Sequence, residues 1–475
     1  MIKISLKFFA LLTIIIALSG CESGGGGDNN FPPQVSTPKW TWISGNDTVY
    51  QPGIYGTKGT AAQSNVPGGR ACPVSWVDSN GKLWLFGGAG VDSASNLNDL
   101  NDLWKYDPTT NEWTWVSGSD VYGQYGVYGT KGVADPANIP GARQAGISWI
   151  DAQGKFWLFG GIGYDSASNQ GPLNDLWKYD PTTNEWTWVS GNNVGSQSGI
   201  YGTMGVADPA NVPGARFDAV SWLDAQGKFW LFGGIGYDST GAGYYYYLND
   251  LWKYDPTTLE WTWMSGSNVY DQIGVYGTKG VSDPANIPGV RTDAVSWLDS
   301  SGNLWLFGGY GLATDRFYGE LNDLWKFSPT TNEWTWVSGS DVQRQTGVYG
   351  TKGTAGPSNV PGGRYGAVSW LDAQRMSWLF GGDGYGSTGG GGFLNDLWKY
   401  DPTTNEWTWI SGSTGYGQIG VYGTRGVADA ANVPGARQGA VSWLDSSGNL
   451  WLFGGEGWDS AGNIGLFNDL WKCTR

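Results

Sequence analysis

The side chains that could do chemistry in this chain are carboxylates, arginines and tyrosines, because its 475 residues include no histidine. This absence excludes Ser-His-Asp and Cys-His nucleophile systems, histidine-ligated zinc or copper, and imidazole acid–base catalysis. An arginine recurs in the pattern R-x-x-x-[VI]-S-W, and an aspartate follows it by two positions at Asp218 and Asp293. An aspartate and an arginine this close in the chain more often form a salt bridge than a reactive pair.

The two residues that follow each of these arginines vary most between copies, so we expect them to contact a ligand. The candidates are Gln144, Phe217, Asp218, Thr292, Asp293, Tyr365 and Gln438. The arginines themselves could ring a channel mouth and hold an anion, or could pair with repeated acids such as those of the N-D-L-W segments. We favour ion pairs for all six: Arg70, Arg143, Arg216, Arg291, Arg364 and Arg437.

A repeat of about 73 residues must position these side chains. The phrase W-L-F-G-G occurs six times, and its first glycine falls at positions 87, 160, 233, 308, 381 and 454. Each unit contains four short strand-like segments, of the types AVSWLD, NLWLFGG, LNDLWKY and EWTWVSG, separated by turn sequences such as D-S-S-G and D-P-T-T-N-E. No segment shows a helical period, so the pattern predicts an all-β domain.

A glycine pair, a later tyrosine and a tryptophan after six further residues, as in Gly160-Gly161, Tyr179 and Trp186, resemble the kelch repeat of galactose-oxidase-like proteins. Two units depart from it, with Phe327 and Cys473 at the tyrosine position. The resemblance implies a β-propeller with one four-stranded blade per unit, hence six blades. It also implies that the positions after the repeated arginine border a central pocket.

The ends of the chain predict how the ring closes. The last unit stops after its third strand, at FNDLWKCTR, whereas TPKWTWISG at 37–45 supplies a fourth strand with no preceding three. Pairing these two segments would complete the sixth blade and remove two exposed sheet edges. We therefore predict a closed six-bladed propeller over residues 40–475.

The tryptophans are predicted to be structural, because five per unit account for thirty of the 31. Trp458 alone lies outside this pattern and remains a candidate ligand contact. The connection VYGTKGVADPANIPG between units is read as a structured flap that packs each blade on the next. We expect its basic residues to stay solvated: Lys58, Lys131, Lys279, Lys352 and Arg425.

The unit-to-unit variation lies on one predicted face of the ring. Because strand direction alternates, the flap, the loop between the second and third strands and the start of the first strand share a long-loop face. Fifteen of the 25 tyrosines map to it, including Tyr244, Tyr245, Tyr246 and Tyr247. Exposed tyrosines suit ligand binding, since each joins an apolar ring to a polar tip. Unselected drift of the loop sequence is the alternative.

The three cysteines lead to two predictions. Residues 1–20 read as a secretory leader, and Leu18-Ser19-Gly20-Cys21 resembles the bacterial lipobox, which implies acylation of Cys21. Residues 21–39 then form a flexible tether, and Glu22 favours the outer membrane or cell surface over inner-membrane retention. Cys72 and Cys473 could pair as a disulfide in an exported protein, or could be two isolated thiols.

We therefore expect a monomeric lipid-anchored envelope module that binds a glycan or an envelope or extracellular protein. The net charge of −15 argues against nucleic acid and anionic lipid surfaces as partners. The alternative is a carbohydrate-active enzyme similar to bacterial sialic-acid mutarotases, with Asp218 or Asp293 beside its arginine. No cofactor is expected; calcium in loops such as GYDSASNQG and GWDSAGNIG is a weaker possibility. Galactose oxidase activity is excluded because its copper site needs histidine.

Overall fold

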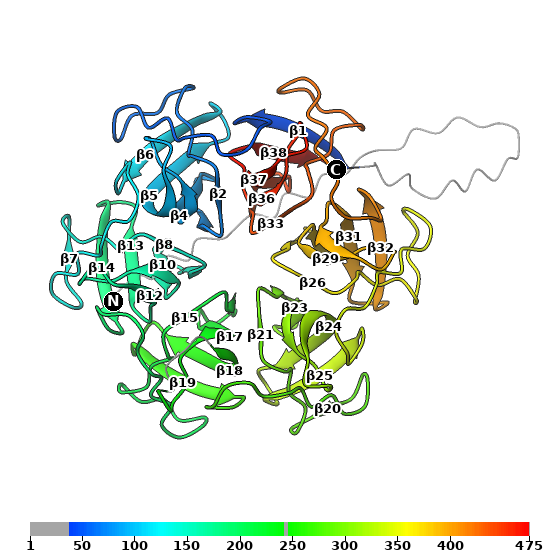
Figure 1. Cartoon of the computed structure of the whole chain (residues 1–475). Helices are drawn as coiled ribbons and strands as arrows, with labels where there is room; N and C mark the ends of the chain where they lie inside the picture. Colours follow the sequence, from blue (N-terminus) through cyan, green and yellow to red (C-terminus); the bar gives the residue numbers. More distant parts are fainter. Residues whose placement is uncertain (1–37, 242–245, 475) are drawn as a thin grey trace, which may run out of the picture. The chain divides into compact units, whose positions relative to one another are not determined.

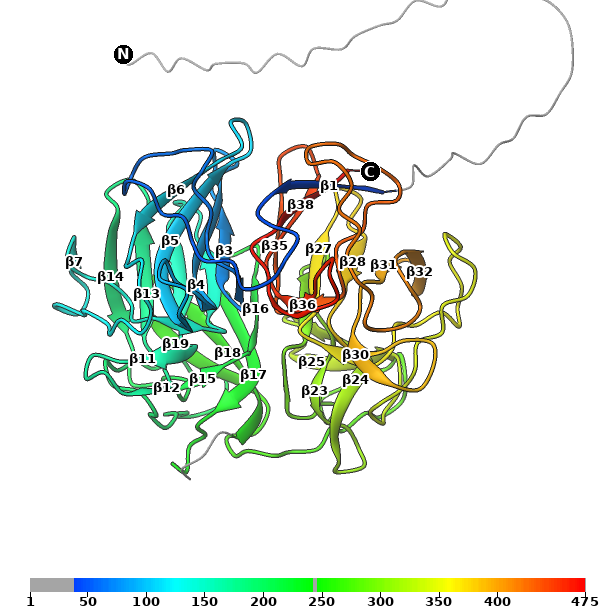
Figure 2. The same ribbon diagram turned by 45° about the horizontal axis from the view of Figure 1, so that its top comes forward.

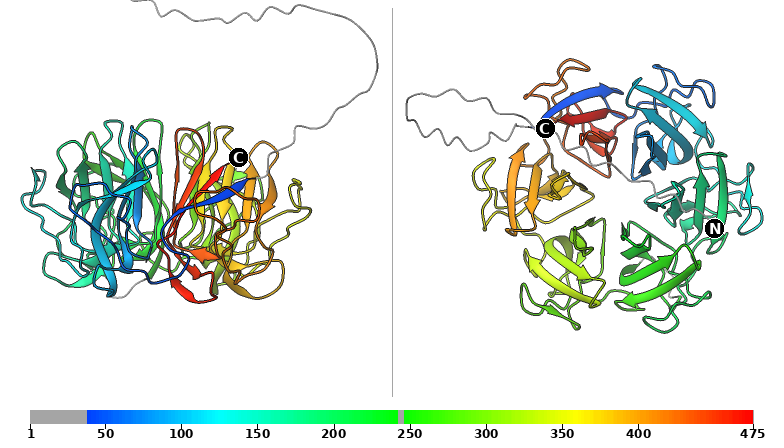
Figure 3. Two further views of the ribbon diagram at one scale, coloured as in Figure 1. Left: turned by 90° about the horizontal axis from the view of Figure 1, so that it is seen from above. Right: turned by 180° about the vertical axis from the view of Figure 1, so that it is seen from behind.

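The computed structural model describes residues 38–241 and 246–474, which form a ring of six antiparallel β-blades around a central axis (Figures 1 and 3). No α-helix occurs within these two ranges, and thus none that could span a membrane. The six-bladed β-propeller predicted from the repeat is confirmed. Its blades are numbered in chain order from residue 70.

Each blade has four main strands, and the first lies nearest the axis. Blade 1 contains β3 (Val74–Val77), β4 (Leu83–Val91), β5 (Leu97–Asp107) and β6 (Glu112–Ser117). Blade 2 contains β9 (Ile147–Ile150), β10 (Phe156–Phe159), β13 (Leu176–Asp180) and β14 (Glu185–Ser190). Blade 3 contains β16 (Val220–Leu223), β17 (Phe229–Gly236), β18 (Tyr246–Asp255) and β19 (Glu260–Ser265). Blade 4 contains β22 (Val295–Leu298), β23 (Leu304–Leu312), β24 (Tyr318–Ser328) and β25 (Glu333–Ser338). Blade 5 contains β27 (Val368–Leu371), β28 (Ser377–Phe380), β31 (Leu397–Asp401) and β32 (Glu406–Ser411). Blade 6 contains β34 (Val441–Leu444), β35 (Leu450–Phe453), β38 (Leu470–Thr474) and β1 (Lys39–Ser44).

A two-residue strand that begins with the repeated arginine precedes the first main strand of every blade. These strands are β2 (Arg70–Ala71), β8 (Arg143–Gln144), β15 (Arg216–Phe217), β21 (Arg291–Thr292), β26 (Arg364–Tyr365) and β33 (Arg437–Gln438). Blades 2, 5 and 6 add a hairpin between the second and third strands: β11 (Ile162–Tyr164) with β12 (Gln170–Pro172), β29 (Asp383–Tyr385) with β30 (Gly391–Phe393), and β36 (Glu456–Trp458) with β37 (Ile464–Leu466).

The glycine pair bends the second strand of each blade and joins it to the next blade. Gly160 and Gly161 have φ of 63° and 96°, and the Gly161 N–H donates to the Arg216 carbonyl of blade 3 at 2.9 Å. A Cβ built on Gly160 would lie 2.7 Å from that same carbonyl oxygen. Glycine is required here because the backbone is left-handed and a neighbouring blade approaches closely.

The N-terminal strand closes the ring. β1 pairs antiparallel with β38, with Trp40 opposite Cys473 and Thr41 opposite Lys472, so the sixth sheet has the order β1-β38-β35-β34 (Figure 2). Trp40 is only 2% exposed and lies in the core with Trp471 and Phe380. The predicted closure by both ends of the chain is therefore confirmed.

Repeated aromatic side chains fill the space between neighbouring blades. Trp149 of blade 2 stacks on Phe229 of blade 3 at 4.9 Å, and Phe159 packs against Trp261 at 5.3 Å. Equivalent contacts recur around the ring, and each core cluster combines residues of adjacent blades. The tryptophans of the repeat are therefore packing residues, as predicted.

The flaps are ordered and cover the outer edges of the blades. β7 (Ala134–Asp135) and β20 (Ser282–Asp283) pair with the fourth strand of the blade that follows them. Lys131 Nζ lies 4.3 Å from the Trp188 ring centroid and donates to the Gly191 carbonyl at 2.8 Å. Lys58, Lys279, Lys352 and Arg425 also lie over tryptophan rings. All five side chains remain exposed, as predicted, and each also makes a cation–π contact with a tryptophan ring.

Candidate functional site

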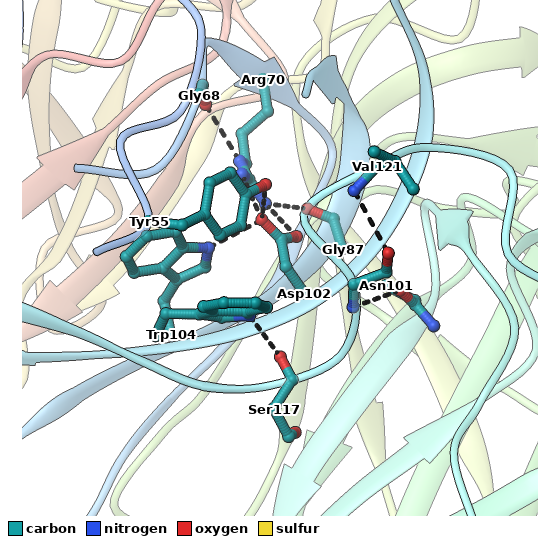
Figure 4. A network of polar contacts seen from close by, with 11 residues as sticks. Tyr55, Gly68, Arg70, Gly87, Asn101, Asp102, Trp104, Ser117 and Val121 are labelled. Carbon is teal, nitrogen blue, oxygen red and sulfur yellow. Dashed lines mark hydrogen bonds and ion pairs between the residues drawn. The ribbon is translucent and has the colours of Figure 1, made fainter. Parts of the chain in front are cut away.

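The repeated arginines form buried ion pairs. In blade 1, Arg70 donates from Nη1 and Nη2 to the two carboxylate oxygens of Asp102, at 2.7 and 2.8 Å (Figure 4). Tyr55 and Trp104 each donate to the same Asp102 Oδ2 at 2.7 Å. Neither side chain of the ion pair has any solvent exposure. The carboxylate is thus fully bonded, which a buried charge requires.

The same ion pair occurs in every blade. The other five are Arg143–Asp175, Arg216–Asp250, Arg291–Asp323, Arg364–Asp396 and Arg437–Asp469. This confirms the prediction that the arginines pair with the acids of the N-D-L-W segments. Arg216 and Arg291 thus pair with Asp250 and Asp323, and not with the nearby Asp218 and Asp293.

Six residues, each two positions after a repeated arginine, form a closed circle at the axis. The backbone N–H of each donates to the carbonyl of its counterpart in the preceding blade, at 2.7 to 3.0 Å, and every φ lies between 51° and 62°. These residues, called here the axial ring, are Cys72, Ala145, Asp218, Asp293, Gly366 and Gly439. Two are glycines, and the other four adopt a conformation that is strained for residues with a side chain. Strain of this kind often marks functional positions.

Two cavities adjoin the axial ring. The axial well, of about 160 Å³, is lined by the ring and the residues that follow it, including Asp218 and Asp293. The side cavity, of about 400 Å³, shares Cys72 and Gly439 with it and is lined by Tyr50, Ala71, Ala89, Leu97, Asn98, Asp99, Gln144, Gln170, Gln438, Glu456 and Leu466. Among these described lining residues none is a lysine or an arginine.

Asp218 and Asp293 interact at the axial ring. Thr292 Oγ1 and the Asp293 N–H both donate to the Asp218 carbonyl, at 3.1 and 3.0 Å. Burial and the neighbouring Asp293 carboxyl raise the pKa of Asp218 well above its ordinary value. Burial also raises the pKa of Asp293 to about 6, although a hydrogen bond from Asp218 opposes this. The two carboxyls therefore hold a shared proton more tightly than a solvated carboxyl would.

A group of tyrosines stands beside the carboxyl pair. Tyr247, Tyr310, Tyr318 and Tyr365, called here the tyrosine group, contact one another with ring centroids 4.7 to 6.3 Å apart. Burial, then Tyr310, then the carboxyls of Asp293 and Asp218 raise the pKa of Tyr247 to about 12. The Tyr247 hydroxyl therefore remains protonated and can donate a hydrogen bond.

The other predicted contacts fall into three groups. Gln144 and Gln438 line the side cavity, where Gln438 donates to Glu456 at 3.3 Å. Thr292 is only 4% exposed and bonds to Asp218, so it positions that residue and offers nothing to a ligand. Phe217, Tyr246 and Trp458 are half-buried and, like the tyrosine group, line neither cavity.

Asp99, Gln170, Asp383 and Glu456 were not among the predicted contacts. Burial raises the pKa of Asp99 to about 6, and Gln170 donates to it at 2.8 Å. Asp383 and Glu456 lie directly opposite Tyr365 and Gln438 across a pair of strands. Strand pairing could have predicted Asp383 and Glu456, because the residue after each glycine pair lies opposite the residue after each repeated arginine.

Cys72 and Cys473 do not form the predicted disulfide. Cys72 lies in the axial ring, where burial and the carboxyls of Asp218, Asp293 and Glu456 raise its thiol pKa. Cys473 lies in β38, packed in the core of blade 6. Blades 6 and 1 are neighbours in the ring, but this does not bring Cys473, on the third strand of blade 6, into a disulfide with Cys72, which precedes the first strand of blade 1.

The loops considered for calcium are closed by their own aspartates. Asp165 Oδ1 accepts from the N–H groups of Ala167 and Asn169, and Oδ2 accepts from Asn169 Nδ2 and Gly195 N. Within residues 38–241 and 246–474, no group of three or more acidic or cysteine side chains could hold a metal ion. Calcium binding stays a prediction. Cys21, Tyr244 and Tyr245 lie outside the described residues.

Comparisons with known proteins match this architecture. The Kelch motif family matches residues 70–120. N-acetylneuraminate epimerases of Shigella flexneri serotype 5b and of Escherichia coli K12 are each 31% identical over 192 residues, covering 35% of this chain and 49% of the relative. N-acetylneuraminate epimerase 2 of E. coli O6:H1 is 32% identical over the same shares.

The chain thus spans about half the length of the curated relatives it matches. The matched motif covers one blade, and the same glycine pair and tryptophan recur in the others. Together with the six four-stranded blades, these findings identify the chain as a kelch-type six-bladed β-propeller.

Proposed function

We propose that this protein binds a free sugar on its long-loop face and interconverts its anomers. The observation that carries this proposal is a carboxyl pair that lines the axial well, with Tyr247 of the tyrosine group close to it and amide side chains in the side cavity. Tyrosine rings offer apolar surface to a sugar ring, and carboxylates and amides bond its hydroxyls. Relatives that share part of the sequence are named as sugar epimerases, which supports the proposal.

Binding can be tested on the full-length protein with a panel of monosaccharides, by saturation-transfer NMR. We expect Tyr247→Ala to weaken sugar binding about tenfold, as stacked tyrosines at binding sites often contribute at least 1.4 kcal/mol. Tyr125→Ala is the matched control, because Tyr125 is 54% exposed and lies in a flap away from the axis. Equal affinities of the two variants, or binding of no sugar, would reject the proposal.

A binding role without turnover is the second candidate. Phe317 is 68% exposed, and Tyr50, Tyr122 and Tyr416 are each 40% exposed or more. Such a rim of aromatic side chains suits recognition of a glycan or an envelope protein. In that case the protein would bind ligand with no effect on anomer exchange.

The location of the chain ends supports a tethered arrangement, which we also propose. Lys39, the first residue of β1, pairs with Thr474, the last residue of β38, so both lie at the short-turn end of blade 6. A lipid anchor at Cys21 would therefore connect to the face opposite the axial well. Mutation of Cys21 to Ser should release the protein from membranes, measured by fractionation.

A further inference from the structure

We propose that Asp218 and Asp293 are the acid–base pair of this anomer exchange and that the substrate is a sugar without a carboxylate. This inference rests on the proposed function and assigns its catalytic residues and substrate class. Both side chains line the axial well, and they are consecutive members of the axial ring. No arginine takes part, because those of both units are bound inside their blades.

The axial ring fixes the two carboxyls relative to each other. Asp218 N–H donates to Ala145 and Asp293 N–H donates to Asp218, so the two backbones are joined by a bond across neighbouring blades. Thr292, buried on β21, adds a second bond to the Asp218 carbonyl. A rigid pair is what bifunctional catalysis needs, since the acid and the base must reach one substrate together.

The charge state of the pair suits this chemistry. Two carboxyls in one buried site cannot both ionise easily, so they hold one proton between them over a range near neutral pH. The titratable groups that face the pair are Cys72, Tyr247 and Tyr365, and burial raises the pKa of each. Glu456 contributes negative charge beside Cys72. None of these groups supplies a cation, so the pair keeps its proton.

A pair that holds one proton can open and close a cyclic sugar with no other reactant. The ionised carboxylate takes the proton of the anomeric hydroxyl, whose oxygen forms a carbonyl with the anomeric carbon. The bond from that carbon to the ring oxygen breaks, and the ring oxygen takes the proton of the carboxylic acid. The two residues have then exchanged roles. After rotation of the carbonyl, the reverse transfers close the ring on its other face and restore the original state.

The electrostatics of the site define the substrate class. The two cavities are lined by Asp99, Asp218, Asp293 and Glu456 and, among the described lining residues, by no cationic side chain. A carboxylate-bearing sugar would meet like charges at close range, which disfavours its binding. A neutral sugar can instead donate its hydroxyls to these oxygens and to Gln144. The site therefore suits an uncharged aldose or N-acetylhexosamine.

The test measures anomer exchange by exchange-spectroscopy NMR on full-length protein, with D-galactose, D-glucose, N-acetyl-D-glucosamine and N-acetylneuraminate as probes. We expect faster exchange of at least one neutral sugar. Asp218→Asn and Asp293→Asn should each lower that rate about 100-fold or more while sugar binding changes less than threefold, because general acid–base catalysis contributes 10²- to 10⁴-fold. Asp120→Asn, at a polar loop position outside both cavities, should leave the rate unchanged.

Each contrary result has a distinct meaning. Sugar binding with exchange that neither Asn variant lowers would overturn the acid–base assignment and leave the binding proposal standing. Faster exchange of N-acetylneuraminate than of neutral sugars would overturn the substrate class. No sugar binding would reject the proposed function and this inference together. If a variant fails to fold by circular dichroism, the wild-type pH profile serves instead: the rate must fall when both carboxyls are protonated and when both are ionised.

Discussion

Arg216 and Asp250 form a fully buried bidentate ion pair, in which Nη1 lies 2.6 Å from Oδ1 and Nη2 lies 2.7 Å from Oδ2. Asp250→Asn would leave the guanidinium charge buried without its counter-ion. We expect the free energy of unfolding to fall by about 3–5 kcal/mol, measured by urea denaturation. The matched surface pair is Lys155–Asp180, at 2.6 Å and about a quarter exposed. Lys155→Gln should cost about 1 kcal/mol or less, and equal losses in both variants would contradict this account.

Gly160 of the glycine pair can be compared with Gly154, which lies outside the pair and has a similar φ. Gly160 and Gly154 have φ of 63° and 73°, but a Cβ at Gly160 meets the Arg216 carbonyl at 2.7 Å, whereas nothing lies within 4 Å at Gly154. Gly154→Ala should cost about 1 kcal/mol, the strain of the left-handed backbone alone. Gly160→Ala should cost at least 2 kcal/mol more, because it also separates two blades. Similar melting temperatures for the two variants would reject a packing role for the pair.

Closure of the ring can be tested at Thr41, opposite Lys472 in the pairing of β1 with β38. The carbonyls of Trp40 and Trp42 accept bonds from Asp429 and Gly426 in the flap, so the N–H of Thr41 faces β38. Thr41→Pro removes that donor and should lower the unfolding free energy by about 3 kcal/mol or more. Thr41→Ala keeps the N–H and should cost about 1 kcal/mol. Equal midpoints of denaturation would show that β1 does not hold the ring closed.

Asp99, which is 2% exposed, makes one contribution to the pH dependence of stability. Burial raises its pKa from 3.8 to about 6 in the folded state. The folded protein therefore binds this proton more tightly than the unfolded chain, so the contribution to stability is full below pH 4 and is lost as pH rises through 6. The loss is on the order of 3 kcal/mol.

Asp99→Asn should remove this loss. The difference in unfolding free energy between wild type and variant, followed from pH 4 to 7.5, is expected to change in the direction that favours the variant at high pH. A difference that stays constant over this range would show that Asp99 titrates normally.

The fold could be predicted almost entirely from the sequence, because repetition acts as an internal control. Residues that recur six times, such as the tryptophans and the arginines of the six units, serve the blade, and the structure buries the arginines and four of the five tryptophans of each unit. The incomplete last unit and the isolated first strand predicted the closure, since unpaired strand edges must be covered. The candidate acids Asp218 and Asp293 were also found this way, as departures from the repeat.

The relationships inside the site required the tertiary structure. Asp218 is two residues from Arg216 in the chain, yet the arginine pairs with Asp250, and Asp218 with Asp293, 75 residues away, because the first strands of neighbouring blades meet at the axis. Sequence proximity was therefore a poor guide to pairing. The sequence alone also did not indicate that Thr292 is buried whereas Gln438 lines the side cavity. The repeated sequence determines how one blade folds. The closing of six blades into a circle decides which of the side chains that differ between blades line one cavity and interact electrostatically.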